Sequence, residues 1–421
     1  MRASRIVRSL PRTRPKARPN QARVAAPPKP LGVAGLFAGI GGIELGLHAA
    51  GHETQLLCEL DPGARAVLEA RFPGVALHAD VRTLRALPSS VELLSAGFPC
   101  QDLSQAGRTA GISGSRSGLV HEVLRLLRSE RTPWLLIENV PFMLQLGKGA
   151  ALDVILSALE ALGYRWAYRV VNSRAFGLPQ RRCRVFLVAA READPTSVLF
   201  ADEAGPPPEV GGEAARKPRA PRPRSSRACG FYWTEGIRGL GWADDGIPTL
   251  KGGSTLGIPS PPAIVLPHGG IVKPDIRDAE RLQGFDPDWT LPALRAAKRG
   301  HRWKLVGNAV TVDVARWLGQ RLLDPGPLAV EIGSVLERGT PWPKAACNIG
   351  SGRRTVHASE WPVRHPSPPL EAFLAFTPEP LSAKATAGFL KRTRVSCLHF
   401  PEGFLEAVES HLTHMQSGAT G

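Results

Sequence analysis

The chain has 421 residues, of which 43% are hydrophobic and 21% charged, a composition typical of globular proteins and not of disordered or fibrous ones. Its six cysteines lie far apart, without a Cys-x-x-Cys pair or a Cys/His cluster at zinc spacing, so we expect neither a disulfide framework nor a metal site. No apolar run approaches the roughly 18 residues of a membrane span, and the Arg-rich start lacks the apolar stretch of a secretory signal, which favours a cytoplasmic protein.

The charge is strongly basic, with 53 Lys and Arg against 37 Asp and Glu and a net charge of +16. This balance favours a polyanionic partner. Residues 1–30 hold nine basic residues and no acid in a Pro-rich setting. We expect a disordered basic tail there, and the alternative is an arm that adds non-specific affinity for nucleic acid.

From residue 31 the pattern changes to alternating strands and helices. A short apolar strand over Leu31–Phe37 leads through a Gly-rich turn at Ala38–Gly42 to a helix over Ile43–Ala50 and a second strand over Thr54–Glu59. The next expected elements are helices near Pro62–Arg71, Gly118–Leu127 and Gly149–Leu162 and strands near Val91–Ala96, Trp134–Glu138, Trp166–Val171 and Arg184–Ala189. This alternation predicts an α/β fold with a mostly parallel sheet covered by helices on both faces.

Composition divides the rest of the chain. We expect the α/β domain to run over 31–190, a Pro/Arg-rich linker over 191–227 and a small irregular domain over 228–275. A return segment of the α/β domain follows at 276–324. The extension 325–421 has no assigned role; packing of its helices onto the small domain is the simpler expectation, and added DNA contact is the alternative.

The turn at Phe37–Gly42 follows a strand and opens a helix, so its backbone amides can receive a polar ligand that approaches closely over Gly39 and Gly41. Glu59 ends the second strand, where a carboxylate can hold ribose hydroxyls. Asp80 follows the third, where it can accept from an exocyclic amine. Packing alone explains a Gly-rich turn equally well, and both acids could instead cap strand ends.

Reactive side chains follow several of the later strands. Cys100 comes directly after the apolar strand 91–96, at the start of a polar, Gly- and Ser-rich stretch where a thiolate can form. Glu138 ends the next strand, and Arg182 and Arg184 alternate at the start of another. The simpler interpretations are a buried thiol, a surface acid and a solvated basic strand.

Together these stretches resemble the DNA (cytosine-5) methyltransferases of bacterial restriction-modification systems. The similarity runs in order from about residue 31 to residue 323. The matching stretches are Phe37–Gly42, Pro99–Gln101, Glu138–Val140, Gln180–Arg184, Arg281–Phe285 and Gly307–Val310. The resemblance implies a Rossmann-like methyltransferase domain that uses S-adenosyl-L-methionine, with a target-recognition domain at 228–275.

For catalysis the resemblance implies that Cys100 attacks carbon 6 of a cytosine swung out of duplex DNA, after which carbon 5 accepts the methyl group. Glu138 would share a proton with ring nitrogen 3, and Arg184 would hold the ring carbonyl oxygen. Arg182 would steady the catalytic loop or a phosphate. No residue identifies itself as the base that removes the carbon 5 proton.

The resemblance also assigns binding residues. For the methyl donor they are Phe37, Gly39, Gly41, Glu59, Asp80, Pro99, Leu119 and Asn308. For DNA they are Gln101 and Arg116, in the loop closing over the flipped base. In 228–275 the candidates for groove contacts are Arg238, Lys251, Lys273, Trp233 and Trp242. The aromatic residues among them could instead form a small core. One departure is Leu60, which stands where some relatives carry a large aromatic, so adenine stacking on that side is weaker.

We therefore expect a monomeric prokaryotic cytosolic enzyme that modifies duplex DNA and is paired functionally with a restriction endonuclease. Three alternatives remain open at this stage. They are methylation of tRNA by the same machinery, a DNA-binding regulator that senses the donor without turnover, and a nicotinamide oxidoreductase with a similar βαβ start. The recognised DNA sequence is not encoded in any motif.

Overall fold

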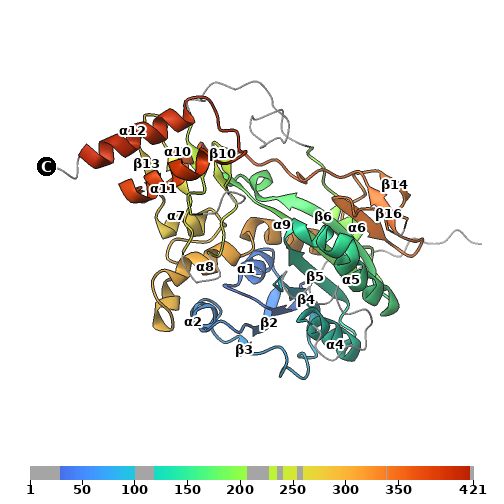
Figure 1. Ribbon diagram of the computed structural model, residues 1–421. Coiled ribbons are helices and arrows are strands. Elements are labelled where there is room, and N and C mark those ends of the chain that lie inside the picture. The colour runs from blue at the N-terminus through green and yellow to red at the C-terminus, as the bar shows by residue number, and fades with distance from the viewer. Residues whose placement is uncertain are drawn as a thin grey trace, which may run out of the picture.

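The computed structural model describes residues 29–99, 118–205, 227–234, 240–253, 259–337 and 339–417. These residues form a ten-stranded sheet with helices on both faces and a five-stranded sheet beside it (Figure 1). A short parallel pairing of β7 (Gln180–Arg181) with β11 (Ile247–Pro248) connects the two parts. Within this described part of the chain, none of the helices is long and apolar enough to cross a membrane.

The half of the large sheet that carries the predicted motifs is parallel, in the order β3-β2-β1-β4-β5. Its strands are β1 (Gly32–Leu36), β2 (Glu53–Cys58), β3 (Ala76–His78), β4 (Val91–Ala96) and β5 (Trp134–Asn139). The associated helices are α1 (Gly42–Ala49), α2 (Pro62–Arg71), α4 (Val120–Glu130) and α5 (Ala150–Ala161). Both α2 and β4 have the predicted bounds. Helix α2 begins at Pro62 because the Asp61 side chain accepts from the next two amides.

The other half of the large sheet is antiparallel. Strand β8 (Cys183–Ala190) runs between β5 and β6 (Arg165–Asn172), and β15 (Ala345–Asn348), β16 (Arg354–Val356) and β14 (Ile332–Val335) continue the sheet beyond β6. The expected parallel sheet is thus present over β3 to β5. The antiparallel half arises because β8 returns beside β6 and because residues of the 325–421 extension add three strands at that edge.

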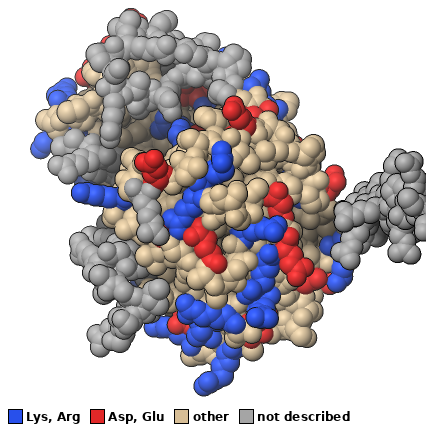
Figure 2. Space-filling model, turned by 90° about the vertical axis from the view of Figure 1, so that its right-hand side faces the viewer, with Lys and Arg blue, Asp and Glu red and all other residues tan. Residues whose placement is uncertain are grey.

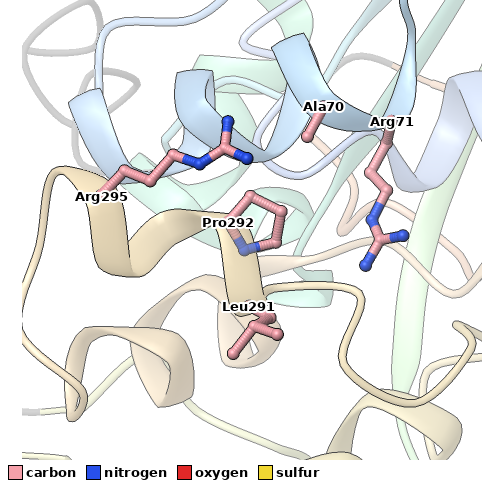
Figure 3. A pocket seen from close by; sticks show the side chains of 5 residues that line it. All are labelled: Ala70, Arg71, Leu291, Pro292 and Arg295. Atoms are coloured by element: carbon pink, nitrogen blue, oxygen red, sulfur yellow. The ribbon is translucent and has the colours of Figure 1, made fainter.

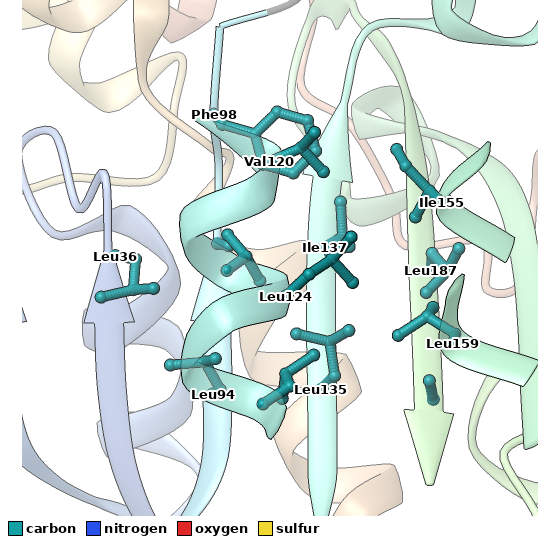
Figure 4. Packing of buried hydrophobic residues seen from close by; sticks show 14 of the residues in the cluster. Leu36, Leu94, Phe98, Val120, Leu124, Leu135, Ile137, Ile155, Leu159 and Leu187 are labelled. Atoms are coloured by element: carbon teal, nitrogen blue, oxygen red, sulfur yellow. The ribbon is translucent and has the colours of Figure 1, made fainter. Parts of the chain in front are cut away.

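Alternate residues of each central strand point to opposite faces of the sheet. Leu36, Leu94 and Ile137 face α4 and α5 (Figure 4). Their strand neighbours, such as Val33 and Leu93, face α1, α6 (Thr196–Leu199) and α9 (Val312–Leu323). Because both faces are covered, these strands are almost continuously apolar, as expected for a buried parallel sheet.

The smaller sheet is antiparallel in the order β10-β9-β12-β13-β17. Its strands are β9 (Cys229–Phe231), β10 (Trp242–Asp244), β12 (Ala263–Val265), β13 (Ile271–Lys273) and β17 (Glu379–Pro380). One face packs on α7 (Ile276–Arg281) and α8 (His301–Asn308), and the other on α11 (Ala383–Thr393) and α12 (Phe404–Ser417). The 228–275 region therefore supplies four strands, and the C-terminal extension supplies the fifth together with the covering helices.

The remaining short helices lie at turns and crossings. They are η1 (Pro141–Leu144), η2 (Leu146–Gly149), η3 (Ser173–Phe176), η5 (Leu291–Arg295) and α10 (Leu370–Phe373). The extension crosses from the large sheet to the small one through contacts with both: the His365 amide donates to the Ala175 carbonyl, and the Leu370 amide donates to the Asp245 carboxylate. On the face shown in Figure 2, Lys and Arg side chains lie interleaved with Asp and Glu.

Candidate active site

Three neighbouring parallel strands end beside one another and carry predicted site residues to one edge of the large sheet. Phe37 follows β1, Gly97 follows β4, and Glu138 lies at the end of β5. A Cβ built on Gly97 would lie 3.7 Å from a Glu138 carboxylate oxygen and 3.9 Å from the Phe37 carbonyl oxygen. The strand ends therefore converge around Gly97, as expected for a ligand site in an open α/β sheet.

The turn after β4 is held against β5 by a buried amide. The Asn139 side chain donates to the Phe98 carbonyl over 3.0 Å, and the Phe98 ring meets Phe37 edge-on with centroids 6.2 Å apart. Pro99 follows at the surface. Cys100 lies outside the described residues, so the structure fixes the segment leading to the predicted nucleophile and not the thiol itself.

Glu138 and Arg184 form a buried ion pair at the centre of this site. The Nε of Arg184 lies 3.0 Å from a Glu138 carboxylate oxygen, and only 7% of Glu138 is exposed. Burial raises the pKa of the Glu138 carboxyl, while the charges of Arg184 and Arg182 oppose the rise. A carboxyl group with a raised pKa next to a guanidinium can donate a proton and a cationic hydrogen bond to the same small ring.

Arg182 does not occupy a position where it could hold a phosphate. Its side chain is 1% exposed, and its guanidinium donates to the carbonyls of Leu250 at 3.0 Å, Gly307 at 3.2 Å and Ala309 at 2.5 Å. The expected phosphate contact is therefore wrong, because the Arg182 guanidinium is buried and donates its hydrogen bonds to backbone carbonyls. Arg182 instead ties the strand that carries Arg184 to Leu250 of the 228–275 region and to the end of α8.

The loop that follows β1 has an unusual backbone. Phe37 has a φ of 55°, and Gly39 and Gly41 have φ values of 57° and 83°. A positive φ is costly for a bulky residue such as Phe37 and points to a functional constraint. A Cβ on Gly41 would strike the Phe72 ring at 2.4 Å, whereas a Cβ on Gly39 would meet no atom of the described residues within 4 Å. Gly41 is thus needed for packing, and Gly39 borders open space.

Glu59 joins this loop to the second strand. One carboxylate oxygen accepts the Gly39 amide at 2.8 Å and the other accepts the Asp61 amide at 2.7 Å. Each carboxylate oxygen retains a second lone pair for a ligand hydroxyl. Open space over Gly39, a strained aromatic residue beside it and a positioned carboxylate fit a nucleoside with a ribose and a cationic sulfur, so these residues fit S-adenosylmethionine.

Asp80 lies two residues beyond β3. Its carboxylate accepts both Nε and Nη2 of Arg82, at 2.9 Å and 2.6 Å. The hydrogen bonds from Arg82 hold the pKa of the Asp80 carboxyl below its ordinary value. The carboxylate is therefore ionised and held in one orientation at the strand end where an adenine amine is expected.

Two further residues that were predicted to bind the methyl donor, Leu119 and Asn308, belong to other elements. Leu119 directly precedes α4 and packs half-buried against the core. Asn308 is the last residue of α8 and is exposed. A Cβ on Gly252 would lie 2.3 Å from the Asn308 amide oxygen, and a Cβ on Gly307 would lie 2.2 Å from the Lys251 carbonyl oxygen. The 228–275 region thus packs directly on the end of α8.

The predicted DNA-binding residues are only partly described. Gln101, Arg116 and Arg238 lie outside the described residues. The Lys251 ammonium lies 4.3 Å from the centre of the Tyr232 ring.

The aromatic and basic candidates of the small domain contact the C-terminal extension. Trp233 and Trp242 pack at the edge of the small core. Trp242 also donates to the His399 carbonyl, and Lys273 pairs with Glu379 at 2.8 Å. The tryptophans therefore follow the alternative in which they form a small core.

Sequence reasoning missed a buried acid next to the loop. Glu44 is 1% exposed and accepts from the Ser95 hydroxyl at 2.8 Å. The sequence does carry a signal for it: Glu44 is an acid in the first turn of a helix whose other residues, apart from His48, are apolar or small. A second omission is the amide of Gln180, which donates to the Leu282 carbonyl and to Gln283 and so fixes the return segment to the Arg motif.

The remaining cysteines, metal-ligand groups and cavities of the described residues offer no second reactive site. Burial raises the pKa of the Cys58 thiol to about 12 and of Cys347 to about 11, so these thiols stay protonated. In the described ranges, no group of three or more His, Cys, Asp or Glu is arranged to hold a metal ion. A cavity of about 330 Å³ lies between α2 and η5, where Arg71 and Arg295 flank Leu291 and Pro292 (Figure 3); its lining contains no strand-end residue.

Comparison with known proteins decides the family. Residues 31–221 match the family model described as C-5 cytosine-specific DNA methylase. The chain is 46% identical over 387 residues to the Type II methyltransferase M2.BsuMI of Bacillus subtilis (strain 168), a match covering 90% of this chain and 97% of the relative. The chain belongs to the C-5 cytosine-specific DNA methylases. It is a DNA (cytosine-5-)-methyltransferase, and its large domain is the Rossmann-like methyltransferase fold of that family.

Other matches concern a shorter part of the methylase. The Type II methyltransferase M.Bsp6I of Bacillus sp. (strain RFL6) is 29% identical over 322 residues, covering 69% of this chain and 98% of the relative. A crystal structure of the S. pombe Dnmt2 methyltransferase aligns with a TM-score of 0.48 and 18% identity over 70% of this chain and 98% of that chain. The match to M.Bsp6I thus includes nearly all of that relative and leaves almost a third of the methylase outside it.

Proposed function

We propose that the methylase transfers a methyl group from S-adenosylmethionine to carbon 5 of a cytosine that has been swung out of a specific duplex DNA site, with Cys100 as nucleophile. The observation that carries the proposal is the Glu138–Arg184 pair at 3.0 Å, which lies beside the glycine loop and next to the turn that leads to Cys100. Carbon 5 of cytosine is a poor nucleophile until a thiolate adds to the ring.

The covalent steps assign one task to each residue. The Cys100 thiolate forms a bond to carbon 6, and the displaced ring electrons are stabilised as Glu138 gives a proton to ring nitrogen 3. Arg184 donates to the ring carbonyl oxygen, where negative charge also develops. Carbon 5 then takes the methyl group, and S-adenosylhomocysteine is the leaving group. Loss of the carbon 5 proton to a base re-forms the ring double bond, and the carbon 6–sulfur bond breaks to release the thiolate. Ring nitrogen 3 returns its proton to Glu138, which restores the starting state of the site.

Elimination among cysteines supports Cys100. Burial raises the pKa values of Cys58, Cys183 and Cys347, and a protonated, buried thiol is a poor nucleophile. Cys229 is buried in β9 of the small sheet. Cys397 is exposed but lies beyond α11, on the far side of the small sheet from α8. Arg182 acts as a positioning residue, since its contacts fix the strand start that carries Arg184.

S-adenosylmethionine supplies an electrophilic methyl group on a sulfonium sulfur. Phe37 borders the donor with its ring, Gly39 leaves room for it, and Glu59 accepts its ribose hydroxyls. Asp80, held by Arg82, accepts the adenine amine. Pro99, Leu119 and Asn308 line the remaining sides.

The DNA partner is supported by the net charge of +16 and by a second domain packed on the end of α8. We place target recognition in the 228–275 region with Arg238 and Lys251, and loop closure over the flipped base with Gln101 and Arg116. We further propose a monomer of the prokaryotic cytosol that protects host DNA from a cognate restriction endonuclease, as the Type II relatives' names suggest.

Incubation with labelled S-adenosylmethionine and duplex DNA tests this function. Wild-type protein and a Cys397→Ser control should incorporate label, and Cys100→Ser should not. Equal incorporation by Cys100→Ser would discard the nucleophile. Label entering tRNA in preference to duplex DNA would favour the tRNA reaction, and salt-dependent DNA binding without product would favour a regulator. Absence of S-adenosylmethionine binding would favour the alternative of a nicotinamide oxidoreductase. Bisulfite sequencing of host DNA would identify the modified site.

A further inference from the structure

Glu44 is a buried acid that the proposed chemistry does not use. It lies in the first turn of α1, two residues after the glycine loop, and is 1% exposed. One carboxylate oxygen accepts from the Ser95 hydroxyl at 2.8 Å. The same oxygen lies 2.2 Å from the place where a Cβ on Gly35 would stand, so Glu44 fills the space that a side chain on Gly35 would take.

The position of this carboxyl follows from the strand register. Gly35 on β1 pairs with Ser95 on β4, and strand alternation puts both residues on the α1 face of the sheet with Gly97. Residues two apart on a strand are separated by roughly 7 Å. The Glu44 carboxyl therefore lies one strand repeat below Gly97, the point around which Phe37 and Glu138 converge. That is directly beneath the proposed donor site.

Among the described residues, none neutralises the Glu44 carboxyl. Its second oxygen is buried without a hydrogen-bond partner, and no ion pair to Glu44 is formed within the described residues. The charged group that acts on it there is Glu59, which is itself an acid. The charged residues of the packed helix α9 have other partners: Arg316 acts on Asp313, and Arg321 pairs with Asp202 at 2.8 Å. Burial raises the pKa of Glu44 to about 7.

We propose that the Glu44 carboxylate is the counter-charge of the donor's sulfonium, through which the methylase prefers the methyl donor to the demethylated product. The inference rests on the proposed donor site. The two ligands share adenosine, ribose and amino acid groups and differ by one methyl group and one positive charge at sulfur. A carboxylate facing that sulfur through a low-dielectric interior therefore stabilises the donor and not the product. Methyl transfer removes the attraction and releases the product.

The same geometry couples donor binding to a proton. Below about pH 7 the carboxyl is largely neutral, and above it is ionised. A sulfonium favours the ionised form, so donor binding releases a proton when it occurs near or below that pH. Donor affinity therefore rises as the pH rises through 7, whereas product affinity does not. Removing the Ser95 hydroxyl, which stabilises the carboxylate, moves this rise to higher pH.

Equilibrium binding of S-adenosylmethionine and of S-adenosylhomocysteine to the full-length protein tests the inference. We expect Glu44→Gln, a variant of the same shape, to weaken donor binding about tenfold and to leave product binding unchanged. Its donor affinity should no longer depend on pH near 7. Ser95→Ala should keep the discrimination above the shifted midpoint. Calorimetry in buffers of different ionisation enthalpy should detect proton release with wild type and none with Glu44→Gln.

The possible outcomes separate this inference from the proposed function. Equal losses for both ligands in a folded Glu44→Gln protein, or no loss for either, would overturn the counter-charge role while leaving the donor site intact. Proton uptake on donor binding to wild type would also overturn it. If wild type bound neither ligand, the donor assignment itself would fail and this inference with it. Should Glu44→Gln not fold, the pH midpoint of Ser95→Ala decides, since an unshifted midpoint contradicts the proposal.

Discussion

Arg184 points its Nε at the carboxylate of Glu138 over 3.0 Å, and both side chains lie where three parallel strands end. The two residues come from neighbouring antiparallel strands, β5 and β8, so the pair is fixed by the sheet and not by a loop. A rigid pair of this kind is pre-organised, and in the proposed reaction it presents a carboxyl group and a positive charge to the cytosine ring, which is the arrangement that electrostatic catalysis needs.

Replacing Arg184 with Ala should change the pH dependence of methyl transfer. Burial raises the pKa of Glu138 and Arg184 opposes that rise, so the variant's carboxyl should keep its proton to higher pH. If protonated Glu138 is the active form, the alkaline fall in rate moves upward, while the maximal rate drops about 100-fold. Single-turnover rates across pH measure both effects. Arg181→Ala is the matched control, and an unchanged profile in Arg184→Ala would contradict the assigned roles.

Replacing Arg182 with Met should destabilise the fold. The change leaves three buried carbonyls, those of Leu250, Gly307 and Ala309, without the guanidinium. We expect the free energy of unfolding in urea to fall by about 2–4 kcal/mol. Arg181→Met, at a less buried position of the same segment, should change it little. Equal stability of the two variants would argue against a positioning role for Arg182.

Substitution by Ala should have different effects at Gly39 and Gly41, the two glycines of the loop after β1. Gly41→Ala forces a Cβ to 2.4 Å from Phe72 at a positive φ and should lower the melting temperature markedly. The Cβ of Gly39→Ala meets no atom of the described residues within 4 Å, so its cost is limited to about 1–2 kcal/mol of backbone strain. It should nevertheless weaken S-adenosylmethionine binding, because the alanine side chain would occupy the space over residue 39 that is proposed for the donor. Unchanged S-adenosylmethionine affinity in Gly39→Ala would contradict donor binding over Gly39.

Truncation before residue 379 should separate the two binding functions. It removes β17, α11 and α12, and so exposes the apolar face of the small sheet that includes Phe231 and Ile271. We expect loss of specific DNA binding with donor binding retained, measured by gel shift and by calorimetry. A chain ending at Ser417 is the control. Full DNA affinity in the shorter chain would show that the small sheet folds without its C-terminal cover.

The sequence predicted the parallel half of the fold well, because its elements carry local signals. Helix α2 has Asp61 as its cap and Pro62 in its first turn, and β4 is apolar apart from Glu92 and Ser95. Strands β14 to β17 were not predicted. They are two to four residues long. Strands β15 and β17 pair with β6 and β13, far away in the chain, and β16 and β14 are added beside β15, an arrangement that no local pattern encodes.

The site was predicted to the extent that motifs place residues at strand ends. Glu138 and Arg184 meet at the expected sheet edge, and Glu59 reaches the glycine loop. The role of Arg182 was misjudged because its partners are backbone carbonyls from residues 250, 307 and 309, and carbonyls leave no mark in a sequence. Glu44 was overlooked because the depth of a helix position depends on what packs against it.

The most direct test of the proposed chemistry is covalent capture by a duplex carrying 5-fluorocytosine at the target site. Fluorine at carbon 5 blocks the final elimination, so the bond between Cys100 and carbon 6 persists. With S-adenosylmethionine present, we predict a denaturation-resistant complex with wild type and none with Cys100→Ser, and peptide mapping should place the bond at Cys100. No complex with wild type, or one that survives in Cys100→Ser, would contradict the account.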